Sequence, residues 1–253
     1  MREARNVIAG LQRLGLAQQP KGCAKNHSVG IHHSWWNVPS NAGGLRADGK
    51  DVSKGLLRLF PASTSSESRS LSRDQLFSFA DPKTTTHAEL AILIYMWGCG
   101  DNDDNVVKFT DLRLEVVESF VSECRGLTES QDLFSNSLFD RLRRSDSEGF
   151  RGLNLSFGSK ILYFCNVKTN LGDHCGIFDK KVSENIDKIT VSTNAGPQKL
   201  SHLMFRKDVA NKVREIPYSD YETYCNFLEE VAEGSGHSFD DVEYFVFNNR
   251  LWQ

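Results

Sequence analysis

Two residues in the second half of the chain have side chains that could carry out covalent chemistry together. Lys160 and Asp179 lie 19 positions apart in the stretch GSKILYFCNVKTNLGDHCGIFD, residues 158–179. A lysine amine that has lost its proton is a nucleophile, and a carboxylate beside it can stabilise developing positive charge. Each residue alone has an ordinary explanation, because Lys160 fits the first turn of an amphipathic helix and Asp179 fits the N-cap of the next one. A cation in the first turn opposes the helix dipole, however, so stability alone does not favour Lys160 there.

The residues around this pair resemble a known enzyme superfamily. Phe157-Gly158-Ser159-Lys160-Ile161-Leu162, followed by Gly176-Ile177-Phe178-Asp179-Lys180-Lys181-Val182, is similar to the helix-hairpin-helix DNA glycosylases. The closest likeness is to their lysine-bearing 8-oxoguanine glycosylase-like branch. There, a glycine-containing hairpin leads into a helix that starts with a catalytic lysine, and a catalytic aspartate follows about twenty residues later. This chain departs from the pattern in having one glycine, Gly158, where the hairpin usually has two.

The resemblance implies that Lys160 and Asp179 are the catalytic residues of a DNA glycosylase that flips a modified base out of DNA. The base would be an oxidised purine or a modified, even glucosylated, cytosine, and removal would leave an abasic site. A Schiff base at Lys160 would add AP lyase activity, whereas a lysine that only assists a water would not. Members of this superfamily include bacterial phage-defence enzymes, so the resemblance implies either a repair or a defence role. Two alternatives stay open: a non-catalytic helical DNA-binding module, and a helical interaction protein.

Phosphate contacts are expected near the hairpin, from Gly158, Ser159, Arg151, Lys180 and Lys181. Bare backbone and basic side chains at such positions hold DNA phosphates without distinguishing sequence. The net charge of −3 hides strong blocks, with +6 over residues 1–63, −8 over 64–140, +6 over 141–216 and −7 over 217–253. Two basic blocks can fold into one basic face for a polyanion.

The base pocket is expected in the stretch IHHSWWNVPSN, residues 31–41. Aromatic faces can stack on a flipped base, and polar side chains can recognise its edge. An equally good explanation for the tryptophans is that they anchor a long loop to the core. The candidates are His32, His33, Trp35, Trp36 and Asn37.

No metal site or cofactor is expected. Cys23, His27, His32 and His33 lie close together, but their spacing matches no familiar zinc motif. The six cysteines are scattered through a mid-sized chain, which favours free thiols in the cytoplasm. The longest apolar run, residues 90–99, is too short to cross a membrane, and a monomer is expected.

The hydrophobic pattern predicts a mainly α protein with an irregular N-terminal third, and the resemblance implies that its helices form a helix-hairpin-helix glycosylase-like fold. Residues 1–65 are expected to form an irregular or helical segment that packs on the core. Residues 66–253 are expected to form the helical glycosylase-like domain, with its hairpin near 152–165. Apolar residues recur at helical spacing in most of the second region, and few stretches alternate as strands do. The expected helices are 2–16, 70–79, 86–97, 109–124, 129–144, 157–165, 180–189, 208–216, 219–232 and 239–247.

Overall fold

The computed structural model describes most of the chain and leaves gaps between its elements. The described residues are 2–31, 46–47, 50–51, 69–99, 114–130, 133–143, 153–193, 195–205 and 216–248.

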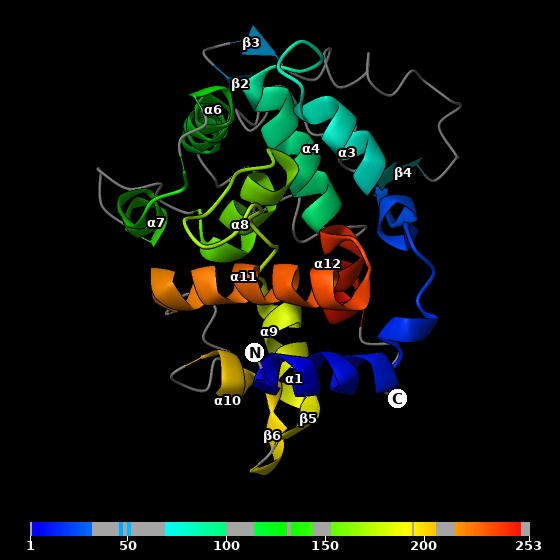
Figure 1. Cartoon of the computed structure of the whole chain (residues 1–253). Coiled ribbons are helices and arrows are strands. Elements are labelled where there is room, and N and C mark those ends of the chain that lie inside the picture. The colour runs from blue at the N-terminus through cyan, green and yellow to red at the C-terminus, as the bar shows by residue number, and fades with distance from the viewer. Residues whose placement is uncertain are drawn as a thin grey trace.

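Helices dominate the described part of the chain, as the sequence predicts. In Figure 1, α11 and α12 cross the middle of the molecule, with α3, α4 and α6 above them and α1 and α10 below. The helices are α1 (Arg2–Arg13), α3 (Arg73–Ala80), α4 (His87–Cys99), α6 (Leu114–Ser130), α7 (Asn136–Arg143), α8 (Leu155–Phe164), α9 (Lys180–Lys188), α10 (Leu200–Met204), α11 (Tyr218–Ser235) and α12 (Phe239–Phe247), with the short 3-10 helices η1 (Leu16–Gln18) and η2 (Cys23–Asn26).

Helix α4 lies in the core. Every residue from Ala88 to Trp97 is buried, and the helix packs against α6, α8 and α3. The sequence predicts this position, because the segment is apolar on all sides and such a helix avoids water only when surrounded by protein. Helix α8, which carries Lys160, therefore rests on a helix that is buried from Ala88 to Trp97.

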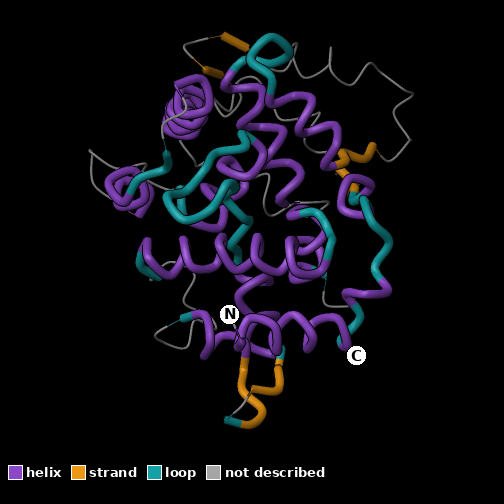
Figure 2. Tube along the Cα trace, viewed as in Figure 1, coloured by secondary structure: helices purple, strands orange, loops and turns teal. Residues whose placement is uncertain are grey.

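The strands form three small antiparallel pairs at the edges of the helical body (Figure 2). Strand β1 (Ser28–Ile31) pairs with β4 (Arg69–Ser72), and β2 (Arg46–Ala47) pairs with β3 (Lys50–Asp51). Strand β5 (Thr190–Thr193) pairs with β6 (Gly196–Lys199) in a hairpin. The sequence did not predict the β5–β6 hairpin, because only Val191 has a large apolar side chain in its strands and their polar faces give no clear alternation.

The predicted helix limits agree best near the C-terminus. Helix α12 has the predicted limits, and α9 ends one residue before the predicted end. Helix α3 begins after Ser72, which caps it in a capping box with Gln75, as the sequence allows. The predicted helix 208–216 lies almost entirely outside the described residues. The division of the chain near residue 65 stays a prediction.

The described helices include none that is both long and apolar enough to cross a membrane.

Candidate active site

The structure brings Lys160 and Asp179 into direct contact. Lys160 Nζ donates one hydrogen bond of 2.8 Å to Asp179 Oδ2 and another of 3.0 Å to the Ser156 carbonyl. Only 5% of the Lys160 side chain and 13% of the Asp179 side chain are exposed. Burying two charges costs hydration free energy that their mutual attraction only just offsets, so a buried ion pair is weak evidence for a purely stabilising role. This pair is therefore the chemical centre of the candidate site.

Helix α9 fixes the orientation of Asp179. The carboxylate is the N-cap of the helix, and its Oδ1 accepts a hydrogen bond of 3.0 Å from the Val182 amide. Burial acts to raise the pKa of Asp179, but the charge and hydrogen bond of Lys160, with the Val182 and Lys181 amides, bring it below its ordinary value of 3.8. Asp179 is thus ionised at neutral pH, and Oδ2 is left for Lys160.

Two buried tyrosines of α11 hold the backbone that leads into Asp179. The Tyr221 hydroxyl donates to the Gly176 carbonyl at 2.9 Å, and the Tyr224 hydroxyl donates to the Ile177 carbonyl at 2.8 Å. Both tyrosine side chains are fully buried, so these hydrogen bonds are shielded from water. Helix α11 therefore sets the point at which the chain delivers the aspartate.

Lys160 lies inside α8, and the expectation that it belongs to the first turn of its helix is wrong. The helix begins at Leu155, two residues earlier than predicted, because the Asn154 side chain accepts a hydrogen bond of 3.2 Å from the Phe157 amide and caps it. The dipole effect is concentrated in the first turn, so it does not govern Lys160. The position of the lysine is set instead by Asp179 and by the neighbouring helix α4.

The pair lies in a cleft of about 460 Å³. Glycine 98 of α4 leaves room for the lysine, since a Cβ there would lie 3.0 Å from Lys160 Cδ and 3.2 Å from Phe157 Cζ. The cleft falls in the size range of small-ligand sites. Its lining residues are His27, Val29, Trp97, Gly98, Ser156, Phe157, Lys160, Asp179, Lys180, Lys181, Glu184 and Phe247.

Two exposed lysines of α9 border the cleft. Lys181 Nζ lies 4.2 Å from the centre of the Phe247 ring, a cation–π contact that holds the ammonium over the cleft wall. Lys180 is 75% exposed and lies 3.7 Å from Glu184 one turn along. Such an exposed pair is weak and leaves Lys180 able to turn toward an incoming anion. A basic border next to a buried lysine amine suits a phosphate-bearing ligand.

A family model described as "Putative 8-oxoguanine DNA glycosylase OGG-like protein" matches residues 22–247. The chain belongs to this family. No curated protein and no solved structure matches this chain. The sequence-based prediction of an 8-oxoguanine glycosylase-like chain with a mainly helical fold is confirmed. DNA is the partner that membership in this glycosylase-like family implies.

The structure corrects the expected phosphate contacts of Gly158 and Ser159. The Gly158 amide donates within α8 to the Asn154 carbonyl at 2.8 Å, so it is not free to bind a phosphate. Ser159 is fully buried, and its hydroxyl accepts a hydrogen bond of 2.9 Å from the Phe178 amide. Both residues lie within α8, which begins after its N-cap Asn154. Ser159 thereby ties α8 to the residue before Asp179.

Gly158 serves helix packing, and its replacement by alanine is expected to destabilise the protein by about 1–3 kcal/mol. An added Cβ would lie 2.5 Å from Leu142 Cδ2 and 2.6 Å from Leu142 Cδ1, and Leu142 is itself fully buried. Unfolding in urea measures the change. Gly126 in α6 is the matched control, because an added Cβ there meets no described atom within 4 Å, and Gly126→Ala should stabilise by about 0.5–1 kcal/mol. Equal stabilisation by both substitutions would contradict the close approach of α7 to α8.

Two aromatic residues of the cleft were not predicted from the sequence. His27 follows η2, and Trp97 lies in α4, with their ring centres 5.3 Å apart in an edge-to-face contact. In the sequence, His27 was considered only as a zinc ligand and rejected, and Trp97 was noted only as the last residue of the expected helix 86–97. Trp97 is 3% exposed, and its indole N–H has no acceptor among the described residues. No local signal joins these positions to Lys160, because the contact arises only when η2, α4 and α8 pack together.

The base-pocket candidates His32, His33, Trp35, Trp36 and Asn37 lie outside the described residues, as does Arg151. Their roles stay predictions.

The two described members of the rejected zinc set have protein partners. The Cys23 thiol lies 3.6 Å from Asp241 Oδ1, and burial, with the Asp241 charge, raises the pKa of this thiol to about 11. His27 accepts a hydrogen bond from Arg73. The described part of the chain has no group of three or more side chains arranged to hold a metal ion.

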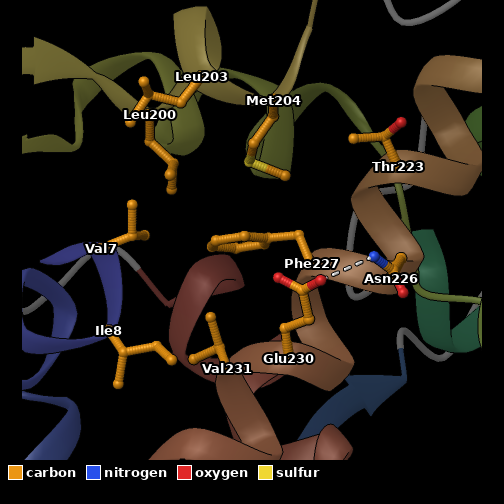
Figure 3. A pocket seen from close by; sticks show the side chains of 10 residues that line it. All are labelled: Val7, Ile8, Leu200, Leu203, Met204, Thr223, Asn226, Phe227, Glu230 and Val231. Carbon is orange, nitrogen blue, oxygen red and sulfur yellow. Dashed lines mark hydrogen bonds between the residues drawn. The ribbon is translucent and has the colours of Figure 1, made fainter. Parts of the chain in front are cut away.

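A second cavity, of about 280 Å³, lies between α1, α10 and α11 (Figure 3). The Phe227 ring lies near its centre, and the Asn226 amide donates to Glu230 at 3.2 Å along one side. Its other lining residues are mostly aliphatic, and none is a nucleophile placed beside an acid or base. Of these two cavities, only the Lys160 cleft places a lysine amine beside a carboxylate.

Proposed function

We propose that the protein is a DNA glycosylase that removes a modified base by attack of Lys160, assisted by Asp179. One observation carries this proposal: a buried lysine amine lies 2.8 Å from an ionised carboxylate in a cleft bordered by lysines. A surface lysine or an ordinary helix cap would need neither the burial nor the cleft. Membership in the 8-oxoguanine glycosylase-like family supports the same assignment.

The reaction requires the target nucleotide to leave the DNA stack. Extrusion costs a few kcal/mol, which contacts to the base and its flanking phosphates offset. Lys180 and Lys181 stand where such phosphates would pass, and Arg151 is proposed to join them. These contacts fix the position of the sugar over Lys160 and do not distinguish sequence.

In the chemical step, Lys160 first gives up one proton, which passes through Asp179 to the leaving base. The amine lone pair then forms a bond to C1′ of the sugar as the glycosidic C–N bond breaks, and the base departs with that electron pair. Asp179, ionised again, stabilises the positive charge on the sugar. Opening of the sugar ring gives a Schiff base between Lys160 and C1′. Loss of a C2′ proton and departure of the 3′-phosphate would then cleave the strand by β-elimination.

The proposed substrate is an oxidised purine in DNA, which the family description favours. A flat purine suits a cleft whose walls include Phe157, Trp97 and Phe247. A modified or glucosylated cytosine is the alternative substrate, and its removal from phage DNA would make the enzyme a defence protein. His32, His33, Trp35, Trp36 and Asn37 are proposed to contribute to base selection.

Borohydride trapping tests the proposal. We expect a covalent protein–DNA adduct when the enzyme is mixed with duplex DNA containing 8-oxoguanine in the presence of borohydride, which reduces the Schiff base. Parallel duplexes with glucosylated 5-hydroxymethylcytosine or unmodified bases determine which base is released. Peptide mapping of the adduct should place the DNA on Lys160.

Two results would contradict the enzymatic assignment. One is DNA binding without release of any base from the panel. The other is full function in Asp179→Asn, since asparagine also caps a helix well but cannot stabilise a cationic sugar by charge. Either result would instead favour a non-catalytic helical DNA-binding module, whose binding weakens with salt and does not need the carboxylate.

A further inference from the structure

We propose that His27 determines which base is accepted, by donating a hydrogen bond from Nε2 to a carbonyl oxygen or ring nitrogen on the edge of the extruded base. This inference rests on the proposed glycosylase function and adds a specificity residue to its cleft. Three observations support it: the position of the ring, the bond that fixes its tautomer, and its charge.

The His27 ring forms part of the wall of the cleft that holds Lys160. Three aromatic rings clamp it, with centre-to-centre distances of 5.3 Å to Trp97, 4.9 Å to Tyr244 and 5.5 Å to Phe247. A ring clamped in this way loses little further freedom when it binds a ligand, and such preorganisation favours recognition. His27 is half-buried, so part of the side chain still reaches the solvent-accessible space of the cleft.

Arg73 fixes the position of the His27 proton. Arg73 Nε donates to His27 Nδ1 at 3.3 Å, and a guanidinium has no acceptor, so Nδ1 must hold a lone pair. The neutral imidazole then carries its proton on Nε2. Arg73 is itself held by a buried ion pair with Glu243 and by a hydrogen bond of 2.9 Å to the Tyr163 hydroxyl. No described residue accepts a hydrogen bond from His27 Nε2, so this donor is available to a ligand.

The surroundings keep His27 neutral. Burial, followed by the charges of Arg73 and Lys181, lowers the pKa of His27 from 6.5 to about 4. A neutral imidazole is a poor phosphate contact compared with Lys180 and Lys181 on the border of the same cleft. It is suited instead to a neutral polar group, which a base edge provides.

A single fixed donor distinguishes bases because a base that presents another donor to it loses binding free energy. A carbonyl oxygen opposite Nε2 forms a hydrogen bond, whereas an amino group there sets two donors against each other and leaves both unsatisfied. Enzymes that build a site around one polar partner reject analogues that lack it more strongly than they reject analogues of different size. His27 would thus favour bases that carry an acceptor at the edge facing it.

The test compares two substitutions that separate the donor from the rest of the side chain. In His27→Asn the amide oxygen can replace Nδ1 as acceptor for Arg73, but no donor reaches the Nε2 position. In His27→Gln the amide nitrogen can reach that position and keep a donor there. Single-turnover base release is measured on duplexes containing one of three bases. They are 8-oxoguanine, 2,6-diamino-8-oxopurine, which has an amine in place of the C6 carbonyl, and 8-aminoguanine, which has an amine in place of the C8 carbonyl.

We expect wild-type enzyme to prefer 8-oxoguanine over at least one of the two amines. For that amine, the preference should fall by about 10-fold in His27→Asn, the value of one hydrogen bond, and should largely persist in His27→Gln. Borohydride trapping on a preformed abasic site, which has no base to recognise, should be equal in all three proteins.

The possible failures are distinguishable. Unchanged preferences in both variants, with base release intact, would overturn the role of His27 alone. An equal loss on all three bases and on the abasic site would show that His27 is merely structural and would also overturn it. Absence of base release by the wild-type enzyme would overturn the proposed function, and the role of His27 with it.

Discussion

Lys160→Gln is expected to lower base release by about 10³-fold or more and to abolish borohydride trapping, because it removes the proposed nucleophile. Glutamine has nearly the length of lysine, and its amide can still donate to Asp179, so the cleft should keep its shape. Affinity for 8-oxoguanine DNA should stay within about tenfold of wild type, since the phosphate contacts are assigned to other residues. Single-turnover kinetics and fluorescence anisotropy measure the two quantities separately.

Lys168→Gln is the matched control for this substitution. Lys168 lies on the connection between α8 and α9, but its side chain is 53% exposed, and its ammonium pairs with Asp173 at 3.4 Å, outside the cleft. Lys168→Gln changes the net charge by the same amount as Lys160→Gln, so a purely electrostatic effect on DNA binding would appear in both variants. Base release at the wild-type rate by Lys160→Gln, or an equal loss in Lys168→Gln, would remove Lys160 from the mechanism.

The Lys160–Asp179 pair could be found from sequence because its signal is local. Asp179 stands directly before a helix whose apolar positions repeat at helical spacing. Two of them, Val182 and Ile186, have fully buried side chains. An aspartate at that place is an N-cap for physical reasons, which fixes the direction of its carboxylate. The family resemblance then supplied Lys160 as its partner, and the 2.8 Å contact agrees with it.

The environment of that pair could not be found in the same way. Gly158 looked like a hairpin glycine, but its use is decided by Leu142 in another helix, which no local pattern reveals. Ser159 looked like a phosphate ligand, and its observed partner, the Phe178 amide, is brought to it only by the packing of α8 against the segment before α9. His27 lies more than 130 positions before Lys160 and reaches the cleft only through packing of η2 against α3 and α12. Periodicity reports which face of an element is apolar, whereas these contacts depend on which elements meet.

The buried Arg73–Glu243 ion pair is the second place where a large effect is expected. Glu243→Leu should lower the free energy of unfolding by about 3–5 kcal/mol, because it leaves a buried guanidinium without its counter-ion. Arg73 is 1% exposed and Glu243 is fully buried, so water cannot replace the lost partner. Burial raises the pKa of Glu243, and the Arg73 charge offsets part of that rise. Each buried charge is therefore stabilised by the other. Urea unfolding at neutral pH measures the loss.

An exposed ion pair provides the control for this effect. Glu123 pairs with Arg141 at 2.7 Å, with 34% and 40% of the two side chains exposed, so Glu123→Leu should change stability by at most about 1 kcal/mol. A similar loss of unfolding free energy in Glu123→Leu and Glu243→Leu would mean that burial does not determine how much an unpaired charge destabilises the protein.

The double variant Arg73→Met/Glu243→Leu separates stability from specificity. It removes both charges together, so most of the stability lost in Glu243→Leu should return, as occurs when buried ion pairs are replaced by apolar side chains. It also removes the Arg73 Nε donor that fixes the His27 tautomer at 3.3 Å. The double variant should therefore be stable, trap abasic DNA through Lys160, and discriminate less between 8-oxoguanine and the disfavoured amine analogue. A stable double variant that keeps wild-type selectivity would show that the Arg73 network holds the fold together without orienting His27.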